Sequence, residues 1–158
     1  MRKRAFLWTA VLLLTAITAG GIIAYRLSSA SIIATAVEDL KSFSRAAELR
    51  YFAAMEPSEA ARSIFAETGI RATLIAQDGS VLADSNFDPS SMDNHLFRPE
   101  VQDALNSEEG YSARFSDTAT EKTLYYGVKL ENGHILRLSK APPSVMEAAS
   151  GTILLIMG

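Results

Sequence analysis

The chain has 158 residues and a formal net charge of −3, which suits one modest domain and gives no argument for nucleic-acid binding. It contains no cysteine, so disulfides and thiolate metal sites are excluded. Its two histidines are too few for a histidine-rich metal site.

The N-terminal part of the chain is strongly apolar. Residues 5–25, AFLWTAVLLLTAITAGGIIAY, form a run of 21 residues without a charge. As a helix this run would span about 30 Å, the thickness of a bilayer core, so we predict a transmembrane helix. The preceding MRKR predicts a cytoplasmic N-terminus for residues 1–4. The alternative is a cleaved signal peptide, whose apolar core is usually shorter, about 7–15 residues.

The C-terminal residues 151–158, GTILLIMG, are also apolar, although about 20 residues are needed to cross a bilayer. We expect residues 141–158 to form a return helix and the start of a truncated second transmembrane helix, with a short tail packed on the domain as the alternative. The intervening residues 26–150 hold all 18 acidic and 12 of the 15 basic residues, a net charge of 12 − 18 = −6. This segment is therefore predicted to lie outside the membrane as an extracytoplasmic domain, where disulfides are permitted but not required.

Extracytoplasmic helices are predicted over residues 26–68. The first covers 28–54, which lacks proline and glycine and carries an apolar stripe of Ile33, Ala36, Leu40, Phe43 and Ala47. The stripe fits either a parallel helix pair in a dimer or a helix lying on its own domain. A shorter helix, SEAARSIFAET, follows Pro57, and Gly69 stands at its expected C-terminal cap.

Residues 69–140 change to strand periodicity. Five strands are predicted, mostly antiparallel, with tight turns at Asp78-Gly79 and Asn132-Gly133. Together with the helices before and between the strands they indicate an α+β fold. The expected strands cover residues 70–76, 80–85, 110–116, 122–130 and 134–140.

The stretch DPSSMDNHLFRPEV, residues 88–101, concentrates polar side chains before a predicted helix with Pro99 at its first position. It lacks the ligand spacing of a calcium loop, the partners of a zinc site and the nucleophile of a catalytic histidine, so we predict no metal and no catalytic residue. Asp93, Asn94 and His95 are expected to bond local backbone groups in a structural loop. The second hypothesis is a ligand-binding or pH-sensing role, because histidine titrates near neutral pH.

Residues 69–140 resemble a known family. The pattern R-x-T-x-I, DG-x-V-x-ADS, DP, MDNH and RPE, followed by an arginine-bearing strand and LYYGVKLENGHILRLS, is similar to the extracytoplasmic sensor region of phosphate-regulon-type sensor histidine kinases. The resemblance implies a PAS/Cache-like fold, a five-stranded antiparallel sheet with flanking helices, between two transmembrane helices. It also implies a homodimer that controls an intracellular kinase and, through it, a response regulator.

The 158 residues contain no kinase motif, since His95 and His134 both fall in the outer domain. ATP and magnesium would belong to an absent kinase part, and no cofactor is expected for the residues given. Two other functions remain open: the sensor domain of another transmembrane receptor, of chemoreceptor or cyclase type, and a membrane-anchored module that binds a cell-envelope partner without sensing a small molecule.

A ligand of a PAS-like domain would lie on the concave sheet face and its covering loop. Arg114, Tyr125 and Arg137, with the loop that includes Arg98, are the candidates for reaching it. For the two strand arginines, however, a solvated strand face is the favoured interpretation, because charged residues are mostly exposed. Tyr125 and Tyr126 point to opposite faces, so at least one ring is expected in the core.

Overall fold

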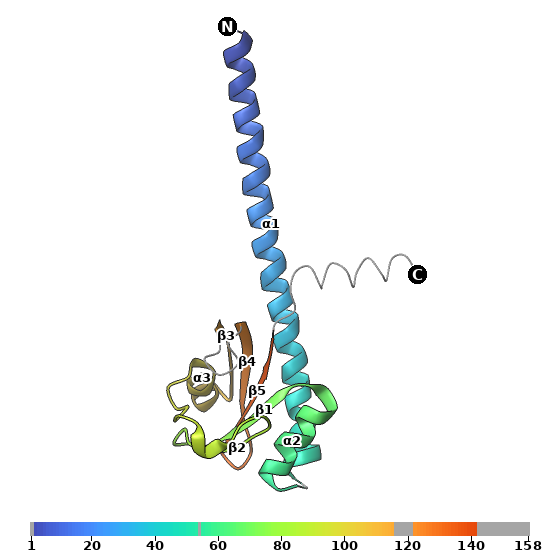
Figure 1. Cartoon of the computed structure of the whole chain (residues 1–158), viewed down its shortest axis with the longest axis vertical. Helices are drawn as coiled ribbons and strands as arrows, with labels where there is room; N and C mark the ends of the chain where they lie inside the picture. The colour runs from blue at the N-terminus through green and yellow to red at the C-terminus, as the bar shows by residue number, and fades with distance from the viewer. Residues whose placement is uncertain (1, 54, 116–121, 142–158) are drawn as a thin grey trace, which may run out of the picture. The chain divides into compact units, whose positions relative to one another are not determined.

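The computed structural model describes residues 2–53, 55–115 and 122–141 (Figure 1). The fold is α+β, with five antiparallel strands in one sheet, as predicted. The helices are α1 (Arg2–Ala47), the π-helix η1 (Glu48–Phe52), α2 (Pro57–Thr68), the 3-10 helix η2 (Pro89–Ser91) and α3 (Pro99–Ser107). The strands are β1 (Arg71–Ile75), β2 (Val81–Asp84), β3 (Glu109–Phe115), β4 (Lys122–Lys129) and β5 (Ile135–Lys140).

Helix α1 includes the whole of the predicted transmembrane segment. It is long and apolar enough to cross a membrane, with a mean hydropathy of 2.0 in its most apolar window. The return helix and truncated second transmembrane helix were predicted over residues 141–158, of which 142–158 lie outside the described residues.

The C-terminal part of α1, from Thr35, belongs to the folded domain. Leu40 and Ala47 are buried within the single chain, which supports the interpretation of the apolar stripe as a helix lying on its own domain. Lys41 of this segment pairs with Glu109 of β3, whose second carboxylate oxygen accepts a bond from the Tyr126 hydroxyl at 2.7 Å. The helix is thus attached to the sheet by apolar packing and by a charged link.

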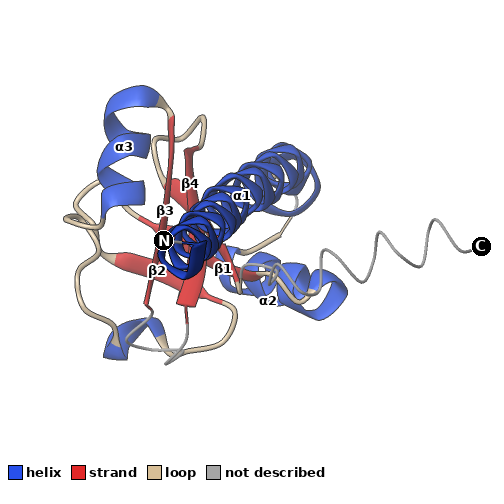
Figure 2. Cartoon of the chain, turned by 90° about the horizontal axis from the view of Figure 1, so that it is seen from above, coloured by secondary structure: helices blue, strands red, loops and turns tan. Residues whose placement is uncertain are grey.

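The sheet has the order β2-β1-β5-β4-β3, so the C-terminal strand β5 lies at its centre. Every neighbouring pair is antiparallel, and a register shift interrupts the β1–β2 pair between Leu74 and Ile75. Helix α3 lies on one face, while α2 and the domain part of α1 lie on the other (Figures 1 and 2). Because both faces are covered, the central strands are buried on both sides.

The two faces differ in chemistry. The face toward α1 and α2 is apolar, and its buried side chains include Leu74, Leu124, Tyr126, Leu136 and Leu138. The face toward α3 has a small apolar cluster at one end, formed by Ile75, Val101, Ala104 and Ile135. The rest of that face carries buried polar and charged side chains, which makes it the unusual half of the core.

Local signals place the element ends. Gly69 caps α2 in the left-handed conformation with φ 68°, and its N–H donates to the Phe65 carbonyl oxygen at 2.8 Å. Gly79 and Gly133 take φ values of 85° and 81° in the two tight turns. Pro99 occupies the start of α3, where its missing N–H leaves no helical bond unmade.

Gly127 of β4 sets how closely α3 approaches the sheet. A Cβ atom at this position would lie 2.7 Å from the Glu100 carbonyl oxygen, which is backbone and cannot turn away. We expect Gly127→Ala to lower the free energy of unfolding by about 1–3 kcal/mol through overpacking, measured by chemical denaturation. The exposed Ala66→Ser serves as a control, and an unchanged midpoint for Gly127→Ala would contradict this close approach.

Candidate functional site: a buried polar cluster between helix α3 and the sheet

A carboxylate stands at the centre of the polar face. Glu100, the second residue of α3, is fully buried. One of its oxygens accepts a bond from the Ser112 hydroxyl at 2.5 Å, and the other lies 3.2 Å from Arg114 Nη2 and 3.6 Å from Arg137 Nη1. Burial by itself would raise the pKa of Glu100, but the Ser112 bond, its own backbone and the two guanidinium groups hold that pKa below its ordinary value. Glu100 is therefore a buried anion that neighbouring strands stabilise.

The two arginines enclose an aromatic ring. Arg114 of β3 and Arg137 of β5 place their guanidinium carbons 4.2 Å and 5.1 Å from the centroid of the Tyr125 ring on β4. These are cation–π distances, so the ring partly compensates the loss of hydration at both cations. Arg137 is 3% exposed, and burial lowers its pKa to about 10, which still leaves it charged at neutral pH.

The polar face continues through β1 to β2. Arg137 Nη2 donates to the Thr73 hydroxyl at 3.2 Å, and that hydroxyl donates to Asp84 at 2.7 Å. Asp84 also accepts from Arg71 Nε at 3.1 Å and from the backbone N–H groups of Asn86 and Phe87. Arg71 is stacked over the Phe87 ring at 4.4 Å. We call Arg71, Thr73, Asp84, Glu100, Ser112, Arg114, Tyr125 and Arg137 the polar cluster.

The residues of the 93–95 loop differ in their contacts and exposure. Asn94 behaves as a structural residue: its side chain donates to the Asp78 carbonyl oxygen at 2.8 Å and accepts from the Leu96 N–H at 2.8 Å. The His95 N–H donates to the Gly79 carbonyl oxygen at 2.7 Å, which fastens the loop to the β1–β2 turn. Asp93 is exposed.

His95 itself is buried, with 7% of its surface exposed. Burial lowers its pKa to about 4, and the positive charges of Arg137 and Arg98 act in the same direction. The Asn94 backbone and the Glu100 carboxylate oppose the shift. The imidazole is therefore neutral at physiological pH, so titration near neutrality, the basis of the pH-sensing hypothesis, is not supported.

This shift predicts a pH dependence of stability. The unfolded chain binds a proton at His95 below about pH 6.5, whereas the folded chain binds it only near pH 4, so acid favours unfolding. We expect His95 to account for a loss of about 2 kcal/mol in unfolding free energy between pH 7.5 and pH 5. Chemical denaturation of the wild type and of His95→Asn at several pH values measures it. A pH profile identical in the two proteins would contradict the assignment to His95.

The structure brings three of the predicted sensing residues together, because Arg114 and Arg137 both contact Glu100 and both lie over the Tyr125 ring. His95 lies near this group, since the positive charges of Arg137 and Arg98 both lower its pKa. Asp93 and Asn94 take no part in the contacts described for the cluster. The expectation of a solvated face for the strand arginines is wrong, because Arg137 is buried and Arg114 is mostly covered. Both tyrosine rings are in the core, where at least one was expected.

Sequence reasoning missed the acidic half of the cluster. Neither Glu100 nor Asp84 was among the candidate site residues. A signal was present, because Glu100 and Ala104 are four residues apart and therefore share the buried face of α3. Arg71 and Thr73 similarly alternate with Ala72 and Leu74, which assigns them to the face opposite the apolar core.

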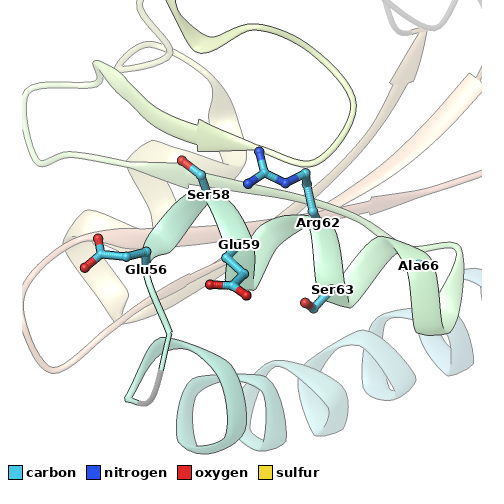
Figure 3. A pocket seen from close by; sticks show the side chains of 6 residues that line it. All are labelled: Glu56, Ser58, Glu59, Arg62, Ser63 and Ala66. Atoms are coloured by element: carbon cyan, nitrogen blue, oxygen red, sulfur yellow. The ribbon is translucent and has the colours of Figure 1, made fainter.

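A surface depression along α2 does not bring reactive side chains together. It has a volume of about 480 Å³ and is lined by Glu56, Ser58, Glu59, Arg62, Ser63 and Ala66. Figure 3 shows that Arg62 and Glu59 extend to different sides of this helix and do not converge on one point. Within the described residues, no group of three or more histidine, aspartate and glutamate side chains is arranged to hold a metal ion.

No family model matches the sequence, and no similar curated protein was found.

Proposed function

We propose that the chain is the extracytoplasmic sensor and membrane anchor of a two-component sensor histidine kinase, which relays an external signal across the membrane to control histidine autophosphorylation. The observation that carries the proposal is the continuity of α1. The same helix contains the apolar segment and, from Thr35 onward, part of the folded domain. In this proposal, a change in the domain acts on the apolar segment through the helix that both share.

The architecture supports a sensor. A five-stranded antiparallel sheet with flanking helices is what the resemblance to the PAS/Cache-like region of phosphate-regulon-type kinases implies. The polar cluster lies on the sheet face and contains three of the residues that we expected to reach a ligand there, Arg114, Tyr125 and Arg137. A buried charged cluster is a costly feature for a structural core, and such features are concentrated at functional sites.

In this proposal the protein is a homodimer with two signalling states. A ligand changes the balance only through a difference in its affinity for the two states, and about 5.5 kcal/mol would convert a 1:99 ratio into 99:1. Transmission runs through α1 and through the return helix predicted after β5. The kinase, with its ATP and magnesium, and the response regulator are partners of the part beyond the residues given.

The proposed topology makes a direct prediction. The chain has no cysteine, so Ser58→Cys on the exposed face of α2 and Lys3→Cys near the N-terminus each introduce a single thiol. In intact spheroplasts, a membrane-impermeant maleimide is expected to label Ser58→Cys and to leave Lys3→Cys unlabelled. After permeabilisation both should react. Labelling of Lys3→Cys in intact spheroplasts, or protection of Ser58→Cys, would refute the extracytoplasmic placement.

The kinase output is tested by joining residue 158 to a histidine kinase module and inserting one to four alanines after Ala141. If a helix transmits the signal, each added residue turns the kinase by about 100°, so autophosphorylation should rise and fall with insertion length. Kinase activity that is the same for all insertions would exclude this transmission. The same fusion without inserted residues is the reference for these measurements.

A further inference from the structure

Arg114 and Arg137 use only part of their hydrogen-bonding capacity with the residues that the structure describes. Arg114 and Arg137 share one oxygen of Glu100, and neither forms a two-bond pair with it. The Nε atoms of both arginines are buried, and no partner for them is found in the part of the chain that the structure describes. A guanidinium group normally offers two parallel N–H donors to a carboxylate, so both arginines have an unmet preference for a further oxygen pair.

The charge balance of the cluster points in the same direction. Among the described residues of the polar cluster, three arginines, at positions 71, 114 and 137, face two buried carboxylates, Asp84 and Glu100, which gives these five side chains a charge of 3 − 2 = +1. Asp84 accepts hydrogen bonds from the Arg71 guanidinium, the Thr73 hydroxyl and two backbone N–H groups, so its oxygens already have several donors. Among the described residues, the groups that compensate the positive charges of Arg114 and Arg137 are the Glu100 carboxylate and the Tyr125 ring, to which Arg137 adds the Thr73 hydroxyl and the charge of Asp84.

We propose that Arg114 and Arg137 form a binding site for a small carboxylate, and that Glu100 is an internal carboxylate which occupies this site until an external one displaces it. The inference rests on the proposed function and names the ligand class of that sensory face. An external carboxylate can supply two oxygens to the Nε edges that Glu100 leaves unpaired. Arg114 is the point of entry, since its side chain is 24% exposed whereas that of Arg137 is 3% exposed.

Displacement of Glu100 would have a structural consequence. Glu100 belongs to the first turn of α3, and its backbone carbonyl packs against Gly127 of β4. When its carboxylate leaves the arginines, the anchoring of that turn to β3 and β5 is lost. The same arginines then hold the ligand, so the site has two arrangements with different positions of the start of α3. A ligand that prefers the second arrangement shifts the population toward it.

The test measures acetate binding to the full chain in detergent micelles. The variants are the wild type, Glu100→Gln, and Glu100→Gln combined with Arg114→Gln, which also lacks the arginine at the entrance. Thermal unfolding is followed by circular dichroism during titration with sodium acetate, and sodium chloride at equal ionic strength is the control. We expect Glu100→Gln, in which the internal competitor is gone, to bind acetate at least tenfold more tightly than the wild type. The double variant should respond to acetate no more than to chloride.

The proposal is overturned if acetate and chloride shift the thermal unfolding of Glu100→Gln equally. It is also overturned if acetate shifts the unfolding of the single and the double variant equally. If Glu100→Gln does not fold, broadening of the ¹³C-acetate resonance by the wild type is compared with that by Arg114→Gln, and equal broadening overturns it. The outcome is separate from the proposed function. If acetate does not bind but the maleimide labelling pattern is as expected, only the proposed ligand class is refuted. If Ser58→Cys proves to be cytoplasmic, the proposed extracytoplasmic sensor is refuted.

Discussion

Glu100→Gln is expected to lower the free energy of unfolding by about 3–5 kcal/mol, as found when one partner of a buried ion pair is removed. The amide keeps the shape of the side chain, but it leaves Arg114 and Arg137 buried without their anion. Since small domains are stable by only about 5–15 kcal/mol, the change should be large in urea or guanidinium denaturation.

Glu59→Gln is the matched control for this experiment, because Glu59 is exposed in α2 and the same charge is removed. Its effect should stay within about 0.5 kcal/mol. Replacing both charges, with Glu100→Gln and Arg137→Met together, should cost less than the sum of the two single changes. Each single change leaves the other member of the Glu100–Arg137 pair without its partner, whereas the double change removes both and leaves only Arg114 without the carboxylate. A loss below about 1 kcal/mol for Glu100→Gln would show that the cluster does not depend on this carboxylate.

Asp84→Ala is the second change with a large expected effect, a loss of about 3–5 kcal/mol. Asp84 is the last residue of β2. Its carboxylate accepts hydrogen bonds from the Arg71 guanidinium, the Thr73 hydroxyl and two backbone N–H groups at the start of the following loop. Without it, Arg71 loses its buried partner and the two N–H groups lose their acceptor. The loop that leads to η2 should therefore loosen, which hydrogen exchange at Asn86 and Phe87 would detect.

Asp93→Ala is the control for Asp84→Ala, since Asp93 is an exposed aspartate in the nearby loop. We expect a change of less than about 0.5 kcal/mol in unfolding free energy. Unchanged exchange at Asn86 and Phe87 in Asp84→Ala would contradict the role of the carboxylate as the anchor of that loop. A large loss in Asp93→Ala would restore the structural role that the sequence led us to expect for that residue.

Much of the fold could be predicted because its signals are local. The turns at Gly79 and Gly133, the cap at Gly69 and the helix start at Pro99 depend on the conformational range of one or two residues. Strand alternation in β4 separated Tyr125 from Tyr126 correctly, since neighbouring side chains of a strand point to opposite faces. A local departure from the expected elements is the π-helix η1, in which the Ala53 N–H bonds back to the Glu48 carbonyl oxygen at 3.2 Å.

The site could be predicted only in part. Arg114, Tyr125 and Arg137 were candidates, because each belongs to a strand that a PAS-like ligand face would use. Their burial was not expected, since the average preference of arginine for solvent says nothing about a particular strand face once a helix covers it. His95 was expected first as a structural loop residue, and titration near neutrality was the basis of the second hypothesis only. Burial lowers the pKa of His95, and so does the guanidinium of Arg137, which is distant in the sequence.

The sequence by itself determined the apolar segment, the order of helices and strands, and the α+β class, because length, periodicity and turn residues act over a few neighbouring positions. Only the tertiary structure decided which charged residues meet. Glu100 and Arg137 are far apart in the chain, and they come together because β5 inserts at the centre of the sheet while α3 closes over the same face. The polar cluster is thus a product of strand order, which no local pattern of residues encodes.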